Sequence, residues 1–443
     1  MAEKQEAVRV DWRQSVGWLS LFRGFRLALD VKKMTLGFVA LLATWGAFLA
    51  LSLVWRLVGL DKPEATWLPN AGRQLVAVAA SVPGAVLSGK TGDLEVNVRL
   101  LRGAVASMSK DYTGFTVVFG ILMILIWSYF GGAISRMAAV QFSRDERISL
   151  TEALAFTGRK YVSLVFAPLI PVLAIIFVCI ITGLVGLLAG IPYFGEWFAG
   201  LFWPLPLVVG FILALITIGG VFGLPLMHPT IGAEGSDAFD AISRSFSYVY
   251  SRPWRAAFYA IVATIYGVIV FTFVVFFAGL LLSASRFCVE FVGGVVFPGI
   301  GIGDKMDRLW PADLSSTAWS LHASEAFQSV EMTGSEEAAA YVLRFWVWVV
   351  WSLAWGFAVS YAYSALTVIY FLLRKNVDNT EFDEVYLEEE EEEFEDFDED
   401  VKGFGEDEET KAEADEPADG DEDAETGDDA ADEESGGDDE DKG

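Results

Sequence analysis

The amino-acid sequence predicts an all-α fold: a polytopic transmembrane bundle of six spans, with interfacial amphipathic helices and a disordered acidic C-terminal tail. Three observations predict it. Six long stretches contain no Asp, Glu, Lys or Arg. Lys and Arg gather in alternate connections between those stretches, and the acidic residues gather at the C-terminal end of the chain.

The six uncharged stretches are each long enough to cross a bilayer. A hydrocarbon core of roughly 30 Å needs about 20 helical residues, whereas helices of soluble proteins average about 12. The stretches therefore predict membrane spans and not buried helices of a soluble core. The first one follows a charged leader, residues 1–33, without a small-residue cleavage site, which indicates a retained anchor. The six predicted spans are 34–54, 115–134, 162–188, 205–227, 256–282 and 345–373.

The formal net charge of −29 comes from one end of the chain. Residues 378–443 carry 36 acidic residues against three lysines, so the rest is slightly basic. This division excludes an ordinary soluble globular domain and a nucleic-acid binder with a basic face. The tail, 377–443, includes six consecutive glutamates and buries too little apolar surface to offset chain entropy, which predicts disorder. Its spaced aromatic residues could bind a basic protein partner; a purely solvating tail is the alternative.

The distribution of Lys and Arg predicts how the chain crosses the membrane, since these residues favour the cytoplasmic side. The leader, the connections 135–161 and 228–255 and the residues after the last span are basic, and the connection 189–204 has neither Lys nor Arg. Both termini are therefore expected in the cytoplasm. The outer loops are then 57–114 and 283–340, and the six basic residues of the first carry little weight in so long a loop.

Three predicted cytoplasmic segments, 18–30, 149–160 and 236–248, each read as an amphipathic helix before a span. Ser149 with Glu152 fits a capping box, and Ser236 with Asp237 fits a helix start. Such helices either lie in the interface, with their basic residues on anionic lipid headgroups, or act as packing elbows that set the span angles. The interfacial basic candidates are Arg23, Arg26, Lys32, Lys33, Arg159, Lys160, Arg244 and Arg252.

Two kinds of pattern concern how the spans associate. Glu152-Ala-Leu and Asp240-Ala-Ile begin matching segments, which predicts a duplicated unit of span, surface helix and span at 115–188 and 205–282. Small residues at four-residue spacing let helix backbones approach closely, either within one bundle or in a homo-oligomer. The candidates for helix packing are Gly219, Gly223, Gly356, Ser360 and Ser364.

The sequence offers little that predicts catalysis. Its two histidines fall in different predicted compartments, its two cysteines at different depths, and no catalytic, cofactor or metal-binding motif is present. The spans also lack the ionisable residues of a proton- or cation-driven pump. We therefore predict a protein that is not an enzyme, without cofactor or metal. A scaffold or accessory protein that engages partners through its cytoplasmic helices and tail is preferred.

Two other functions stay open. The repeat and the Gly- and Pro-interrupted spans favour a transporter or channel for lipid or another weakly charged solute. An enzyme acting through the outer loops is the third possibility, although the acidic residues and His322 there show no familiar spacing.

The segment 223–253, GLPLMHPTIGAEGSDAFDAISRSFSYVYSRP, together with the leader segment 21–30, LFRGFRLALD, carries a family resemblance. It resembles uncharacterised multi-pass inner-membrane proteins of planctomycete-type bacteria. More loosely, Asp-Ala-Ile before a span is similar to bacterial membrane domains of unknown function, including one that accompanies glycerophosphodiester phosphodiesterases. The resemblance implies a bacterial inner-membrane location and no activity, because no phosphodiesterase motif is visible.

Overall fold

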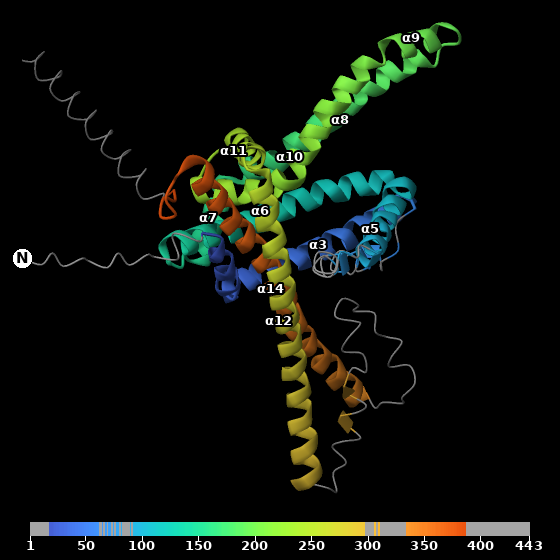
Figure 1. Cartoon of the computed structure of the whole chain (residues 1–443). Helices are drawn as coiled ribbons and strands as arrows, with labels where there is room; N and C mark the ends of the chain where they lie inside the picture. Colours follow the sequence, from blue (N-terminus) through green and yellow to red (C-terminus); the bar gives the residue numbers. More distant parts are fainter. Residues whose placement is uncertain are drawn as a thin grey trace, which may run out of the picture. The chain divides into compact units, whose positions relative to one another are not determined.

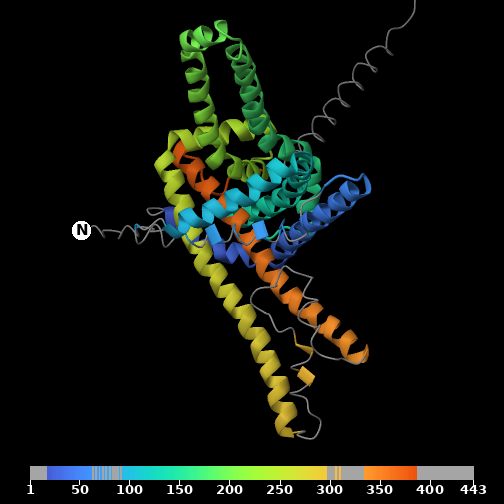
Figure 2. The ribbon, with the colours of Figure 1, turned by 90° about the vertical axis from the view of Figure 1, so that its right-hand side faces the viewer.

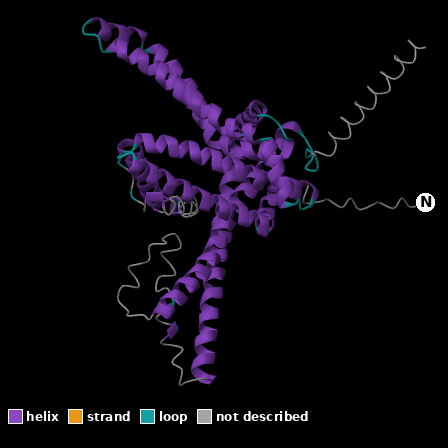
Figure 3. Cartoon of the chain, turned by 180° about the vertical axis from the view of Figure 1, so that it is seen from behind, coloured by secondary structure: helices purple, strands orange, loops and turns teal. Residues whose placement is uncertain are grey.

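The computed structural model describes residues 17–61, scattered positions between 64 and 89, and 92–296, 305–306, 309–310 and 334–386. The regular elements of this described part are all helices, as Figure 3 shows, which confirms the all-α prediction. Residues 1–16, residues 297–304, His322 and the acidic segment 387–443 lie outside the described residues.

Each of the six predicted spans lies within one long helix, and every helix extends beyond the span at both ends. These helices are long and apolar enough to cross a membrane, which confirms the multi-pass membrane class. They are α3 (Val31–Leu57), α6 (Thr113–Arg144), α8 (Tyr161–Ala189), α10 (Pro204–Glu234), α12 (Pro253–Val296) and α14 (Gly334–Asp378).

Shorter helices join the long ones. The leader is not one amphipathic helix, because it divides into a 3-10 turn, η1 (Gly17–Phe22), and α2 (Arg23–Ala28). The expected surface helices are present as α7 (Leu150–Arg159) and α11 (Ala238–Ser251), and α9 (Phe194–Phe202) joins α8 to α10. The connection expected as an outer loop at 57–114 contains α5 (Gly92–Asp111).

Side-chain caps determine where α7 and α11 begin. The Ser149 hydroxyl accepts the Glu152 amide at 3.1 Å, and the Glu152 carboxylate accepts the Ser149 amide at 3.3 Å, which confirms the capping box. At α11 the N-cap is Asp237, whose carboxylate accepts the Asp240 amide at 2.8 Å. In each of the two predicted repeat units, a long helix, a short helix and a second long helix follow one another as expected. The duplication itself stays a prediction.

Helix α14 packs against α3, α6, α10 and α12, and most of its apolar window is buried. In Figures 1 and 2, α8 and α10 lie side by side with α9 at their tip. The connections at 145–160 and 235–252 and the leader meet at one end of the long helices, which we call the elbow end. It comprises η1, α2, α7 and α11 with the adjoining ends of α3, α6, α8, α10, α12 and α14.

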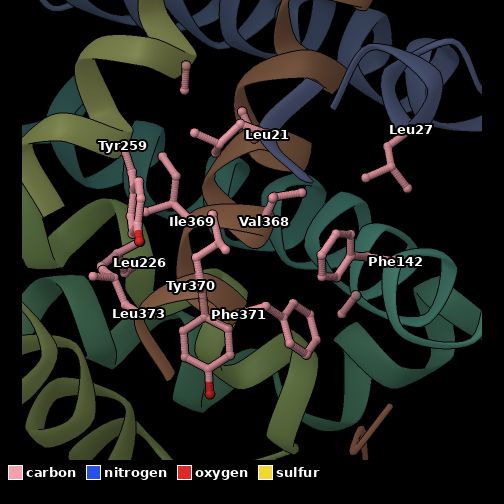
Figure 4. Packing of buried hydrophobic residues seen from close by; sticks show 14 of the residues in the cluster. Leu21, Leu27, Phe142, Leu226, Tyr259, Val368, Ile369, Tyr370, Phe371 and Leu373 are labelled. Carbon is pink, nitrogen blue, oxygen red and sulfur yellow. The ribbon is translucent and has the colours of Figure 1, made fainter. Parts of the chain in front are cut away.

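The largest apolar cluster of the described residues lies at the elbow end. Figure 4 shows Tyr370 and Phe371 of α14 packed among side chains from the leader, α6, α10 and α12. Phe142 of α6 contacts Phe371 with ring centroids 5.2 Å apart. Burial of large apolar side chains is the main stabilising term of such a cluster, so the elbow end is the packed part of this fold.

Candidate functional site

The site begins at Gly235, the C-cap of α10. Gly235 has a φ of 63°, and its amide donates to the Ile231 carbonyl at 2.8 Å, which closes the helix in the left-handed conformation that glycine favours. The next free carbonyl, Gly232, accepts the Arg136 guanidinium of α6 at 3.2 Å. One of the open backbone acceptors in the last turn of α10 is thus satisfied from another helix, as a buried helix end favours.

The final residue of α10, Glu234, binds cations from two other helices. Its Oε2 lies 3.0 Å from Nη1 of Arg244 on α11, and its Oε1 lies 3.2 Å from Nε of Arg374 on α14. The Tyr370 hydroxyl also donates to Oε1. Glu234 and Arg374 are only 10% and 11% exposed. We call Glu234, Arg244, Tyr370 and Arg374 the Glu234 cluster; it joins α10, α11 and α14 through one carboxylate.

Two groups on α11, in or beside this cluster, have shifted pKa values. Burial disfavours the charge of Arg244, but its hydrogen bond to Asp240 and the carboxylates of Asp240 and Glu234 outweigh burial and raise its pKa. Burial, the hydrogen bond that its hydroxyl donates to Asp378, and the nearby carboxylates raise the pKa of Tyr248. Tyr248 therefore stays a neutral hydrogen-bond donor at neutral pH.

The chain after α14 folds back over the Glu234 cluster. Nη1 of Arg374 donates to the Glu384 carbonyl at 2.8 Å, and the Tyr386 amide donates to the Ala233 carbonyl at 2.9 Å. We call residues 379–386 the strap. The predicted boundary of the disordered tail at 377 is therefore too early: α14 continues to Asp378, and the strap is ordered.

Aromatic side chains of the strap pack onto cationic and aromatic groups. Phe382 lies edge-on to Phe142 at 5.6 Å between centroids, and the Lys375 ammonium lies 4.5 Å from the Phe382 ring. The Tyr386 ring fills the space beside Gly235, where an added Cβ would lie 2.7 Å from it. The two aromatic residues thus anchor the middle and the C-terminal end of the strap to the elbow end.

The structure brings most of the predicted packing residues into close contacts. At Gly356 of α14 an added Cβ would lie 2.3 Å from the Met34 carbonyl of α3, and Ser360 Oγ donates to the Ala28 carbonyl at 2.9 Å. Ser364 is fully buried. Gly219 and Gly223 instead face the Phe246 ring of α11. They make room for a surface helix, which favours the packing-elbow interpretation of α11.

The predicted interfacial basic residues separate into two groups. Lys33 is fully buried and donates to Gln141 Oε1 at 2.6 Å, so the prediction that it meets headgroups is wrong. The long Lys33 side chain, at the start of an apolar helix, points inward because the Gln141 side chain provides a hydrogen-bond acceptor there. Lys160 is half-buried beside the Tyr386 ring, and Arg244 belongs to the Glu234 cluster. The exposed members are Arg26, Lys32, Arg159 and Arg252, with Arg23 half-buried.

The remaining chemistry-bearing residues make ordinary contacts. His228 Nε2 lies 3.4 Å from Ser128 Oγ, which in turn donates to the Leu164 carbonyl at 3.0 Å. Cys179 and Cys288 are free thiols. Within the described ranges, no three His, Cys, Asp or Glu side chains are grouped as a metal site would need.

Sequence reasoning missed the Glu234 cluster and the strap. Glu234 stands at the end of an apolar stretch with its nearest basic residue, Arg244, in a separate helix. The position of Arg374 after the last predicted span indicates only the topology. A single acidic residue that ends an apolar helix, followed by Gly, is the feature that could have identified the cluster.

The long apolar helices and the ion-paired elbow end define a multi-pass helical membrane protein. No family model, curated protein or solved structure matches this chain.

We predict that Arg374→Gln loosens the strap. Because hydrogen bonds to charged groups contribute about 1.5–3 kcal/mol, the Tyr386 amide should exchange its hydrogen roughly tenfold faster or more. Hydrogen–deuterium exchange of the detergent-solubilised chain measures this. The neighbouring Lys375→Gln removes the same charge but breaks contacts to strap side chains, the exposed Glu381 and the Phe382 ring. Arg374 binds the strap backbone at Glu384 as well, so Lys375→Gln should raise exchange less than Arg374→Gln. Equal exchange in both variants would contradict the role of Arg374.

Proposed function

We propose that this chain is a non-enzymatic scaffold of a bacterial inner membrane, with both termini in the cytoplasm, that presents its acidic C-terminal segment to a basic protein partner. One observation supports the proposal above others. The strap, which directly precedes the acidic run, is bound to α14 through Arg374 and to α10 through the Ala233 carbonyl.

A tail that only solvates the protein would not need the strap. A freely solvated acidic segment needs no fixed origin, whereas a segment that recruits a partner gains effective concentration at a defined place from one. Its acidic composition with spaced aromatic residues suits a basic partner through complementary charge. The bundle is then the anchor, and the acidic segment is the binding element.

The proposal is tested by complementation in cells that lack the chain. Three forms are compared: the full chain, a chain that ends at Tyr386, and a full-length chain whose acidic residues after 386 are changed to Asn and Gln. The last two should fail to restore the cellular function while reaching the membrane normally. Full function in the shortened chain, together with solute flux that changes only when spans are altered, would instead support the transporter or channel.

A further inference from the structure

Two arginines of the leader share one carboxylate on the surface of the elbow end. Nη2 of Arg23 and Nη2 of Arg26 lie 3.1 Å and 2.9 Å from the same oxygen, Oδ1 of Asp145. The side chains are 38%, 63% and 67% exposed in that order. We call Arg23, Arg26 and Asp145 the arginine fork. Two positive charges against one negative charge leave it with a surplus of one.

The position of the Asp145 carboxylate in the fork is electrostatically unfavourable. Asp145 is the C-cap of α6 and has a φ of 57°, so its charge lies at the negative end of a helix dipole, where anions are disfavoured. Arg23 is positioned independently of it, because its guanidinium lies 4.9 Å from the Phe142 ring centroid. A stronger anion could therefore replace Asp145 while the arginines stay in place.

The surroundings of the fork combine positive charge with exposed apolar groups. Lys32, which donates to the Ile148 carbonyl at 3.2 Å, is exposed nearby on α3. Glu146 is the other acidic residue next to Asp145 in sequence, between the basic residues Arg144 and Arg147. Beside them in the fold, the exposed apolar side chains at the start of α3 include Val31, which is 69% exposed.

This combination matches the headgroup level of a membrane. Residues Leu29 and Val31 stand where α3 begins, and Asp145 stands where α6 ends, so all three are at the ends of helices that contain predicted spans. Basic side chains with apolar neighbours at that level bind anionic lipid, the apolar groups entering the acyl boundary and the cations meeting phosphate.

We propose that the arginine fork binds the phosphate of an anionic lipid headgroup, and that Asp145 occupies the two guanidinium groups when no lipid is bound. This inference rests on the membrane location of the chain but not on its proposed scaffold function. Phosphate presents several oxygens and can accept from both arginines at once, whereas they now share one carboxylate oxygen.

Native mass spectrometry of the full chain in neutral detergent, titrated with phosphatidylglycerol, tests the site. Arg23→Gln with Arg26→Gln should weaken binding by about thirtyfold, and Asp145→Asn should strengthen it by about fivefold, taking about 1 kcal/mol per charge at an anionic surface. Asn also tolerates the left-handed conformation at 145. Arg99→Gln with Arg102→Gln on α5 removes the same charge elsewhere and should leave binding unchanged.

Two further titrations, with other ligands, show whether the bound phosphate belongs to a lipid or is free. Phosphatidylcholine should bind weakly to all forms, and inorganic phosphate should not displace phosphatidylglycerol. Displacement by inorganic phosphate would show a site for free phosphate and overturn the lipid assignment. Unchanged binding in the double arginine variant, or weaker binding in Asp145→Asn, would show that the fork is a structural ion pair and overturn the proposal.

Discussion

Replacing Glu234 by Gln is expected to destabilise the protein by about 3 kcal/mol. The substitution keeps the shape of the side chain but removes the charge that Arg374 and Arg244 share. Arg374 is nearly buried, so it would lose its closest counter-ion in a place where water cannot replace it. Arg244 is 41% exposed and retains Asp240, so it adds less. Thermal or denaturant unfolding in detergent, followed by circular dichroism, measures the loss.

The matched control is Glu95→Gln on α5. Glu95 pairs with Arg99 at 3.2 Å, but both side chains are exposed, and such pairs contribute between about 0 and 1 kcal/mol. The control should therefore unfold almost like the original protein. If both substitutions cost the same, the Glu234 cluster does not join the three helices as we describe.

The second large effect is expected at the contact between α3 and α14. An added Cβ at Gly37 would lie 2.8 Å from the Gly356 carbonyl and 2.9 Å from the Val359 Cβ. The first atom is backbone, so the two helices must separate. We expect Gly37→Ala to destabilise the protein by about 1–3 kcal/mol, the usual cost of overpacking a tight contact.

Gly46 provides the control within the same helix. An added Cβ there meets nothing within 4 Å, so Gly46→Ala should be neutral or stabilising by up to about 1 kcal/mol, the helix propensity difference. Both variants are measured by thermal unfolding under the same detergent conditions. Similar losses at Gly37 and Gly46 would show that α3 and α14 do not approach closely.

Most of the secondary structure could be predicted because it depends on local signals. Uncharged stretches longer than a bilayer is thick specify the six long helices, and side-chain caps such as Ser149 with Glu152 specify where α7 begins. These signals lie within a few residues of the structure they determine. Hydrophobic periodicity similarly indicated the buried face of α11, where Ala241 and Val249 are buried.

The candidate site could not be predicted because its partners are far apart in sequence. Glu234 meets Arg374 across 140 residues, and Lys33 meets Gln141 across 108. Nothing local distinguishes a lysine that turns inward from one that reaches headgroups. The strap was missed for a related reason: its acidic composition predicts disorder, but Phe382 and Tyr386 contact aromatic and cationic groups on α6, on α14 and at Lys160, between α7 and α8.

The structure of the leader differs from the predicted one for a third reason. Its apolar spacing predicts one amphipathic helix, yet the chain divides between η1 and α2. Leu21 and Leu27 are both buried, whereas Phe22 and Leu29 are exposed. Tertiary packing against α14 and α12 therefore overrides the local periodicity in a segment this short.

The membrane assignment requires that lipid surround the six long helices. Size-exclusion chromatography with light scattering, applied to the full chain purified from membranes with and without detergent, tests this directly. We predict a single defined species in detergent and aggregation once detergent is withdrawn, because apolar faces such as those of α8 and α10 become exposed to water. A monodisperse species in plain buffer would contradict the membrane assignment.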